Sequence, residues 1–238
     1  MILAYAVSII GFTMFWKVEQ NKKNPLIDFS LFSSMPFNAA TISNFSLNLM
    51  TSIVGFSIMF YLQDGRGLPA FQAGLTTVGY LTTLIFFIRI GEKLMSKFNS
   101  MYLMAAGSSI AAVPLLILMF TSASNITYTV LCFLALAVIG VGNGVYATPS
   151  TVTAVSASAE EKAAVASGIY KMSSALGSSV GITIAGAIQT SILKATNNIN
   201  MSMKTLIVVA CITGLLGAVA AILCKNSSKK ALPNRISL

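Results

Sequence analysis

Polar side chains that recur inside otherwise apolar stretches are the residues of this chain best placed to do chemistry. Between positions 37 and 62 they stand three or four residues apart, as Thr41, Asn44, Asn48 and Thr51 or Ser52. That spacing places them in one stripe along a helix. Amides and hydroxyls in such a stripe can bind a ligand in a cavity, and they can equally hydrogen-bond a neighbouring helix. The residues alone favour neither interpretation.

Lys171 is a base inside a later apolar stretch, next to Tyr170. It lies about seven residues inside its segment, which corresponds to about 10 Å of helical rise. In one interpretation it is a cation that faces a cavity, where it tunes the local potential or interacts with a proton relay. In the other, its long stem carries the ammonium group to the cytoplasmic headgroups. The second is favoured, because this depth is within the reach of a lysine.

Polar and aromatic side chains inside the apolar stretches are therefore the candidates for contact with a ligand. They are Asn44, Asn48, Tyr80, Asn143, Tyr146, Tyr170 and Lys171. The chain has no histidine, its apolar stretches hold no carboxylate, and it has no nucleophile elbow, phosphate-binding loop or zinc-ligand spacing. The sequence predicts no enzyme, no catalytic residue, no metal site and no cofactor.

Small residues form a second pattern, which concerns packing and gating. Gly140, Gly142 and Gly144 alternate along one stretch that Pro149 follows, and Gly177 and Gly181 stand four residues apart in the next. Glycines at these spacings allow two helix backbones to come close together. Because proline removes a backbone donor, we expect Pro149 to break its helix near the cytoplasmic end, with close packing or bending as the result.

These residues must be positioned by elements that lie in lipid. Apolar residues make up 55% of the 238 positions and charged residues 9%, with a mean hydropathy of +0.82, whereas a water-soluble domain has about 25% charged residues. The apolar stretches predict helices near residues 1–16, 37–62, 72–90, 100–120, 127–149, 164–191 and 204–224. The first is too short for a span of about 20 residues, so it is expected to be a helix whose start is missing.

The distribution of basic residues among the connections indicates how the chain is oriented in the membrane. Eleven lysines and arginines lie in connections on the side of the C-terminal tail, and three lie on the opposite side. Cytoplasmic connections are the basic ones in membrane proteins, so the tail, residues 225–238, is predicted to be cytoplasmic. The net charge of +9 is dispersed over helix ends, which argues against a nucleic-acid partner.

The longest connection, residues 17–36, is predicted to be a cytoplasmic linker. Within it Leu26, Phe29 and Phe32 stand three residues apart, which is typical of a short amphipathic helix on the membrane surface. A plain linker is an equally good interpretation.

Several segments carry a family resemblance. They are Pro25-Leu-Ile-Asp-Phe-Ser-Leu-Phe32; Leu68-Pro69 with Gln72-Ala-Gly-Leu75; and Gly140 to Pro149 followed by Ala166-Ser-Gly-Ile-Tyr-Lys-Met172 and Leu176-Gly177. They resemble the PLIDLxLF, SPLxAGL, GxGxGxxxxP and ASGxYKMxxxLG segments of the 14-helix drug:proton antiporters of the major facilitator superfamily. Quinolone and quaternary-ammonium efflux pumps of Gram-positive bacteria belong to that branch.

The chain departs from the family's pattern in two places. The loop Lys93-Leu-Met-Ser-Lys-Phe-Asn99 resembles a KLxDKFG gating loop, with Ser96 at the usual acidic position and Asn99 at the usual glycine. Gly79 stands where the family often has proline. Charge-based gating by this loop is therefore not expected.

The resemblance implies an all-α membrane protein: the C-terminal six-helix bundle of a major facilitator fold, residues 37–224, preceded by one truncated helix, residues 1–16. Such folds bind substrate between two bundles and rock one against the other. The chain would then be one half of a proton-coupled multidrug efflux transporter in the bacterial cell membrane, inactive on its own. Its implied partners are the lipid bilayer, amphipathic cationic drugs, protons and the missing N-terminal bundle.

Two other functions stay open at this point. Seven spans with a cytoplasmic C-terminus match a seven-helix receptor or photoreceptor, although a retinal lysine belongs in the last helix and Lys204 lies only at its outer edge. The chain is also compatible with a non-transporting product of a truncated transporter gene, or with a subunit that pairs with a separately made N-terminal half.

Overall fold

The computed structural model describes residues 13–14 and 29–230, with side chains up to residue 222 in the last helix. The long helices among residues 29–230 are α2 (Met35–Phe60), α3 (Ala70–Leu94), α4 (Ser100–Ala112), α5 (Asn125–Ser156), α6 (Ala163–Thr196) and α7 (Ile199–Lys230). A π-helical turn, Tyr61–Gly65, extends α2, and a 3-10 helix, Val113–Met119, extends α4. Each of the six resulting segments is long and apolar enough to cross a membrane. The predicted all-α membrane fold is confirmed.

The predicted truncated helix, residues 1–16, lies outside the described residues except for Thr13 and Met14, which are helical. Most of the linker and the last eight residues of the tail also lie outside. The linker residues Phe29–Ser33 form one 3-10 turn, in which Leu31 is buried and Phe32 is exposed. Lys162 Nζ donates to Ser30 Oγ at 3.0 Å, so this turn touches the connection between α5 and α6. The amphipathic surface helix stays a prediction.

Helices α5 and α6 run further at their C-terminal ends than hydropathy predicted, and hydroxyl groups donate to backbone carbonyls near these ends. In α5, Thr151 and Ser156 donate to the carbonyls four residues earlier, at 2.9 and 2.6 Å. In α6, Thr196 does the same at 2.8 Å. A prediction based on hydropathy ends the helix before such polar residues. Their hydrogen bonds to backbone carbonyls are nevertheless compatible with a helix. The start of α7 also lies five residues before its prediction.

The expectation that Pro149 breaks its helix is wrong. Pro149 lies inside α5, which continues to Ser156. Proline removes only one backbone donor, the one that would bond the carbonyl four residues earlier. The carbonyl of Pro149 itself accepts the Thr153 hydroxyl at 2.7 Å, and the surrounding residues are buried against other helices.

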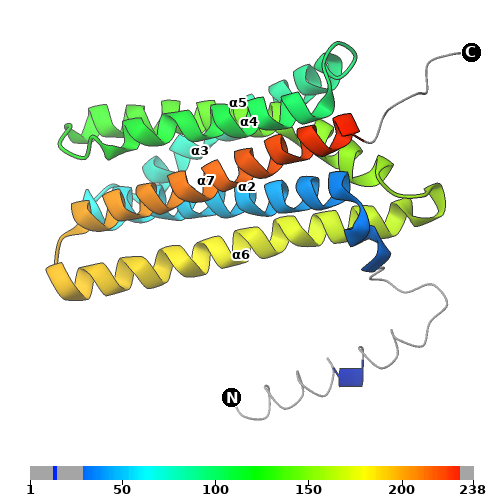
Figure 1. Ribbon diagram of the computed structural model, residues 1–238. Helices are drawn as coiled ribbons and strands as arrows, with labels where there is room; N and C mark the ends of the chain where they lie inside the picture. Colours follow the sequence, from blue (N-terminus) through cyan, green and yellow to red (C-terminus); the bar gives the residue numbers. More distant parts are fainter. Residues whose placement is uncertain (1–12, 15–28, 231–238) are drawn as a thin grey trace, which may run out of the picture.

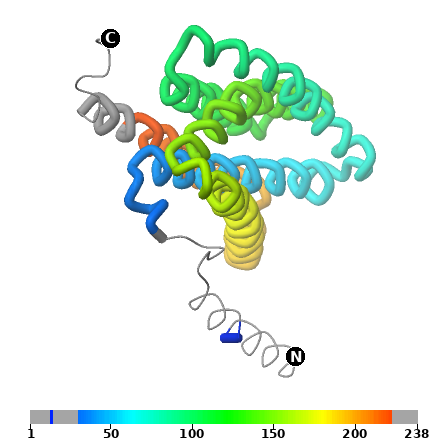
Figure 2. Tube along the Cα trace, turned by 90° about the vertical axis from the view of Figure 1, so that its right-hand side faces the viewer, coloured from blue at the N-terminus to red at the C-terminus, as the bar shows by residue number. Residues whose placement is uncertain are grey.

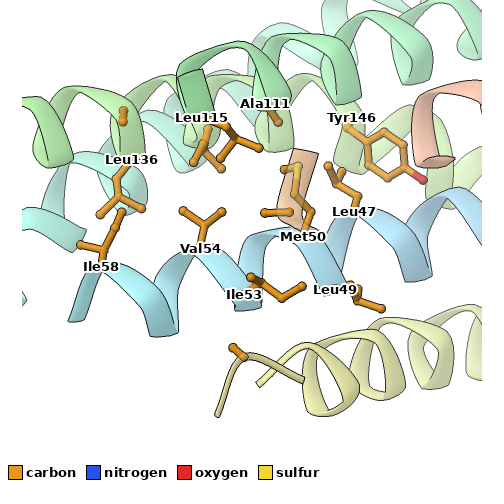
Figure 3. Close-up of a cluster of buried hydrophobic side chains, with 14 of the residues drawn as sticks. Leu47, Leu49, Met50, Ile53, Val54, Ile58, Ala111, Leu115, Leu136 and Tyr146 are labelled. Carbon is orange, nitrogen blue, oxygen red and sulfur yellow. The ribbon is translucent and has the colours of Figure 1, made fainter. Parts of the chain in front are cut away.

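The helices form a bundle in which α2 and α7 lie between α6 on one side and α4 with α5 on the other (Figure 1). Helix α3 packs mainly on α5, at the edge of the bundle (Figure 2). Figure 3 shows the core, where Val54 and Ile58 of α2 lie opposite Leu115 and Leu136. Helix α2 is the most enclosed of the six and α3 among the least, and exposed apolar side chains of α3 such as Ile85 and Phe86 suit contact with lipid or with another bundle.

The glycines that the sequence singled out lie where backbones come close. A Cβ atom on Gly142 of α5 would lie 2.5 Å from the backbone nitrogen of Ala111 in α4, and Gly140 and Gly144 face α3 instead. On α6, a Cβ atom on Gly181 would lie 2.6 Å from the carbonyl oxygen of Leu49 in α2, and Gly177 faces the carbonyl of Phe45. Any side chain there would push two helices apart, whereas a role of these glycines in gating stays a prediction.

Replacing Gly142 with leucine should therefore lower the amount of folded protein in the membrane severely, because the obstructing atoms belong to the α4 backbone. The matched control is Gly55→Leu in α2, where a Cβ atom meets nothing within 4 Å. Membrane abundance and the thermal unfolding midpoint in detergent measure the difference. Equal behaviour of the two variants would contradict the close approach of α4 and α5.

Candidate functional site

A polar cavity of about 180 Å³ lies between α2, α3, α5 and α6. Its lining residues are Asn44, Leu47, Asn48, Tyr80, Leu84, Asn143, Tyr146, Ala147, Thr151, Tyr170, Lys171 and Ser174. All seven candidates from the sequence are among them, so four helices far apart in the chain bring these residues to one place. That the cavity takes a substrate is still a prediction.

Asn44 joins α2 to α6 in the wall of this cavity. Its side-chain nitrogen donates to the carbonyl of Tyr170 at 3.1 Å and to the hydroxyls of Ser173 and Ser174 at 3.2 and 2.6 Å. An amide nitrogen has two hydrogens, so one of them is shared between two acceptors. Asn44 is buried, and its role is therefore to hold the two helices together as well as to line the cavity.

Asn48 lies one turn further along α2 and, among the described residues, makes hydrogen bonds only within that helix. Its side-chain nitrogen donates to the backbone oxygen and the side-chain oxygen of Asn44, at 2.8 and 3.0 Å. The polar stripe of α2 thus divides between the two interpretations that the sequence left open: Asn44 bonds a neighbouring helix, whereas Asn48 has no bond to one and lines the cavity.

Asn143 connects three helices on the opposite wall. Its side-chain nitrogen donates to the hydroxyl of Tyr80 on α3 at 3.1 Å and to the hydroxyl of Thr51 on α2 at 3.2 Å. Its side-chain oxygen is buried and has no hydrogen-bond partner among the described residues. Since the Tyr80 oxygen accepts the bond from Asn143, its own hydrogen remains available as a donor.

Two buried tyrosines form the end of the cavity where α5 and α6 meet. The hydroxyls of Tyr170 and Ser150 lie 2.5 Å apart and share a hydrogen bond. The hydroxyl of Tyr146 donates to the carbonyl of Ala40 on α2 at 3.4 Å. These bonds orient both rings, so this end of the cavity is aromatic.

Lys171 is the cationic member of the lining. Its side chain is exposed, and its Nζ lies 5.7 Å from the centroid of the Tyr170 ring, within the range of a cation–π contact. The carboxylates that the structure describes are Asp64, Glu92, Glu160 and Glu161, and none of them lines the cavity. The lining therefore combines amides, hydroxyls and phenols with one positive charge.

The lining residues that the sequence analysis did not choose stand at helical spacing from those it did. Leu84 follows Tyr80 by four positions, Ala147 follows Asn143 by four, and Thr151 follows Ala147 by four. Extending each candidate by one turn would have found Leu84 and Ala147, and a second turn would have found Thr151. Ser174 was not among the candidates, although it accepts the shortest of the Asn44 bonds.

Comparison with known proteins gives consistent matches. Residues 1–182 match the profile of the Major Facilitator Superfamily. The chain is 38% identical over 194 residues to the quinolone resistance protein NorB of Staphylococcus aureus strain MRSA252, and 37% identical over 194 residues to NorB of strain JH9. Each match covers 81% of this chain and 41% of the relative. The chain spans less than half the length of the curated relatives it matches.

Proposed function

Because the chain belongs to the Major Facilitator Superfamily, a family of membrane transporters, we propose that it forms one half of a multidrug:proton antiporter. It is a multi-pass protein of the bacterial cell membrane, and in our proposal its C-terminal tail is cytoplasmic. Family membership sets aside the seven-helix receptor as an alternative. A non-transporting product of a truncated gene remains as an outcome of the test below.

The observation that carries this proposal is the cavity between α2, α3, α5 and α6. Polar and ionisable side chains inside a membrane bundle are costly, and they mark ligand pathways when they face a wet space. The cavity has a volume of about 180 Å³, whereas a pocket for a drug-sized molecule measures about 300–1,000 Å³. The proposed bundle thus supplies one wall, and a second bundle supplies the rest.

Coupling to protons needs a group that gains and loses a proton as the transporter turns over. The carboxylates that the structure describes lie outside the lining of this cavity. We therefore assign the proton-accepting carboxylate to the other bundle, and to this chain a share of the drug site. One bundle alone has nothing to rock against, so the isolated half should not transport.

Ethidium efflux from energised cells tests the proposal directly. Cells expressing this chain alone should export no more ethidium than cells with an empty vector. Cells that also express the N-terminal bundle of a quinolone resistance relative should export it, and a protonophore should stop the export. Protonophore-sensitive efflux by the chain alone would contradict the need for a second bundle. Absence of efflux in every combination would favour the non-transporting product.

Asn48→Leu should reduce drug export in the assembled transporter several-fold without reducing its abundance in the membrane. Asn48 lines the cavity, yet its hydrogen bonds stay within α2, so its loss should leave the packing of the helices intact. Thr183→Leu is the matched control, because Thr183 is exposed on α6 and its hydroxyl also bonds only its own helix. Unchanged export by the Asn48 variant would remove this residue from the drug site.

A further inference from the structure

The charge of the cavity wall favours an anionic group of a ligand, whereas the family resemblance implied cationic drugs. Its lining contains Lys171 and, among the residues the structure describes, no carboxylate. A cationic group of a drug placed against this wall would meet a like charge, which is unfavourable. An anionic group would meet an opposite charge in the same place.

Lys171 has unused donors. An ammonium group carries three hydrogens, and the structure gives the Lys171 Nζ a contact with the face of the Tyr170 ring and no hydrogen bond or ion pair within the described part of the chain. A charge within a membrane bundle is stabilised by a counter-charge. The same lining includes the hydroxyl of Tyr80, whose oxygen accepts a bond from Asn143 and whose hydrogen is available to donate.

The size of the cavity limits how much of a ligand this wall can hold. A volume of about 180 Å³ accommodates one end of a drug-sized molecule. A carboxylate on a flat ring system suits the available chemistry, since the carboxylate can accept charge-assisted hydrogen bonds from Lys171. The attached ring can lie against the aromatic and aliphatic side chains of the lining, among them Tyr80, Leu47 and Leu84.

The geometry points to a carboxylate-binding subsite at Lys171, so that this wall takes the anionic end of an aromatic carboxylic acid drug. This inference rests on the proposed function, because it makes the cavity part of the drug site. It differs from the expectation of cationic drugs in placing any cationic group of the ligand away from this wall, toward the other bundle. Lys171 is thus a specificity-determining residue.

The test measures binding of norfloxacin and of its ethyl ester to the whole chain in lipid nanodiscs by equilibrium dialysis at neutral pH. The two probes share their ring system and their basic amine, and only the acid has a carboxylate. The unmodified chain should bind the acid at least about tenfold more tightly than the ester, as expected for one charge-assisted hydrogen bond. Lys171→Met should remove that preference, so that the acid and the ester bind with equal affinity, whereas Lys171→Arg should keep it.

Lys194→Met is the matched control, because Lys194 is an exposed lysine near the other end of the same helix, and it should bind both probes as the unmodified chain does. The inference is overturned if the acid and the ester bind equally, if the ester binds more tightly, if Lys171→Met keeps the preference, or if the unmodified chain does not bind the acid. Failure of the proposed function has a different readout. Equal export of acid and ester by the assembled transporter would overturn only the subsite, and absence of any drug export would overturn the transporter.

Discussion

Replacing Asn44 with leucine should both destabilise the bundle and abolish drug export, the largest combined effect of any substitution in the cavity. Asn44 is buried and its side-chain nitrogen holds three acceptors on α6. A hydrogen bond between membrane helices contributes about 0.6 kcal/mol on average and up to about 1.7. Loss of two or three such bonds should lower the free energy of unfolding by about 1–3 kcal/mol.

The contrast with Asn48→Leu makes this prediction specific. Both variants place leucine in the polar stripe of α2, but only the Asn44 variant removes bonds to another helix. Membrane abundance and the unfolding midpoint should fall for Asn44→Leu and stay unchanged for Asn48→Leu. A double-mutant cycle between Asn44→Ala and Ser174→Ala should give a coupling energy of about 0.5–1.5 kcal/mol. A coupling energy of zero would mean that the 2.6 Å bond contributes nothing.

The sequence predicted the helices and the cavity residues because both depend on local periodicity. A polar stripe inside an apolar helix is visible from spacing alone, and residues such as Asn44, Asn143 and Lys171 stand out because polar side chains are rare in such segments. Which of them meet across the bundle depends on packing. The bond of Asn44 to Ser174 spans 130 positions, and no local pattern specifies it.

Helix ends and connections were the poorer part of the prediction. Hydropathy ended α5 at Pro149, whereas hydroxyl bonds to backbone carbonyls accompany the helix to Ser156. Asn99, which replaces the glycine of the family's loop, caps α4 by accepting a bond from the Met101 nitrogen at 2.9 Å. Arg66 was counted only as a charge in a connection, because its two shortest bonds go to backbone oxygens, which any residue type can supply.

Replacing Arg66 with glutamine should destabilise the bundle at least as strongly as the loss of Asn44. Arg66 lies at the end of the bundle opposite to the C-terminal end of α7. Arg66 follows the π-helical turn of α2, and its guanidinium donates to the carbonyls of Thr121 and Ala123, each at 2.7 Å. It also lies 4.5 Å from the centroid of the Tyr128 ring. The connection between α2 and α3 is thereby fixed to the one between α4 and α5.

Through Tyr61, Arg66 is also linked to the connection between α6 and α7. The guanidinium lies over the Tyr61 ring, 5.3 Å from its centroid, and the Tyr61 hydroxyl donates to the side-chain oxygen of Asn200 at 2.5 Å, at the start of α7. Hydrogen bonds from a charged donor contribute about 1.5–3 kcal/mol each, and a cation–π contact about 0.5–2. Because Arg66 is only half-buried, the expected loss of unfolding free energy is reduced to about 2–4 kcal/mol.

Arg89→Gln provides the control for the removal of an arginine. Arg89 forms an exposed ion pair with Glu92 at 3.4 Å, with 81% of the arginine side chain exposed, and such pairs contribute about 0–1 kcal/mol. Thermal unfolding in nanodiscs should therefore show a clearly lower midpoint for Arg66→Gln than for Arg89→Gln. Arg66→Lys should recover only part of the loss, because an ammonium group cannot donate in the fork geometry that reaches both carbonyls. Full recovery by lysine would reduce the role of Arg66 to its charge, and equal midpoints for the two glutamine variants would contradict the contact altogether.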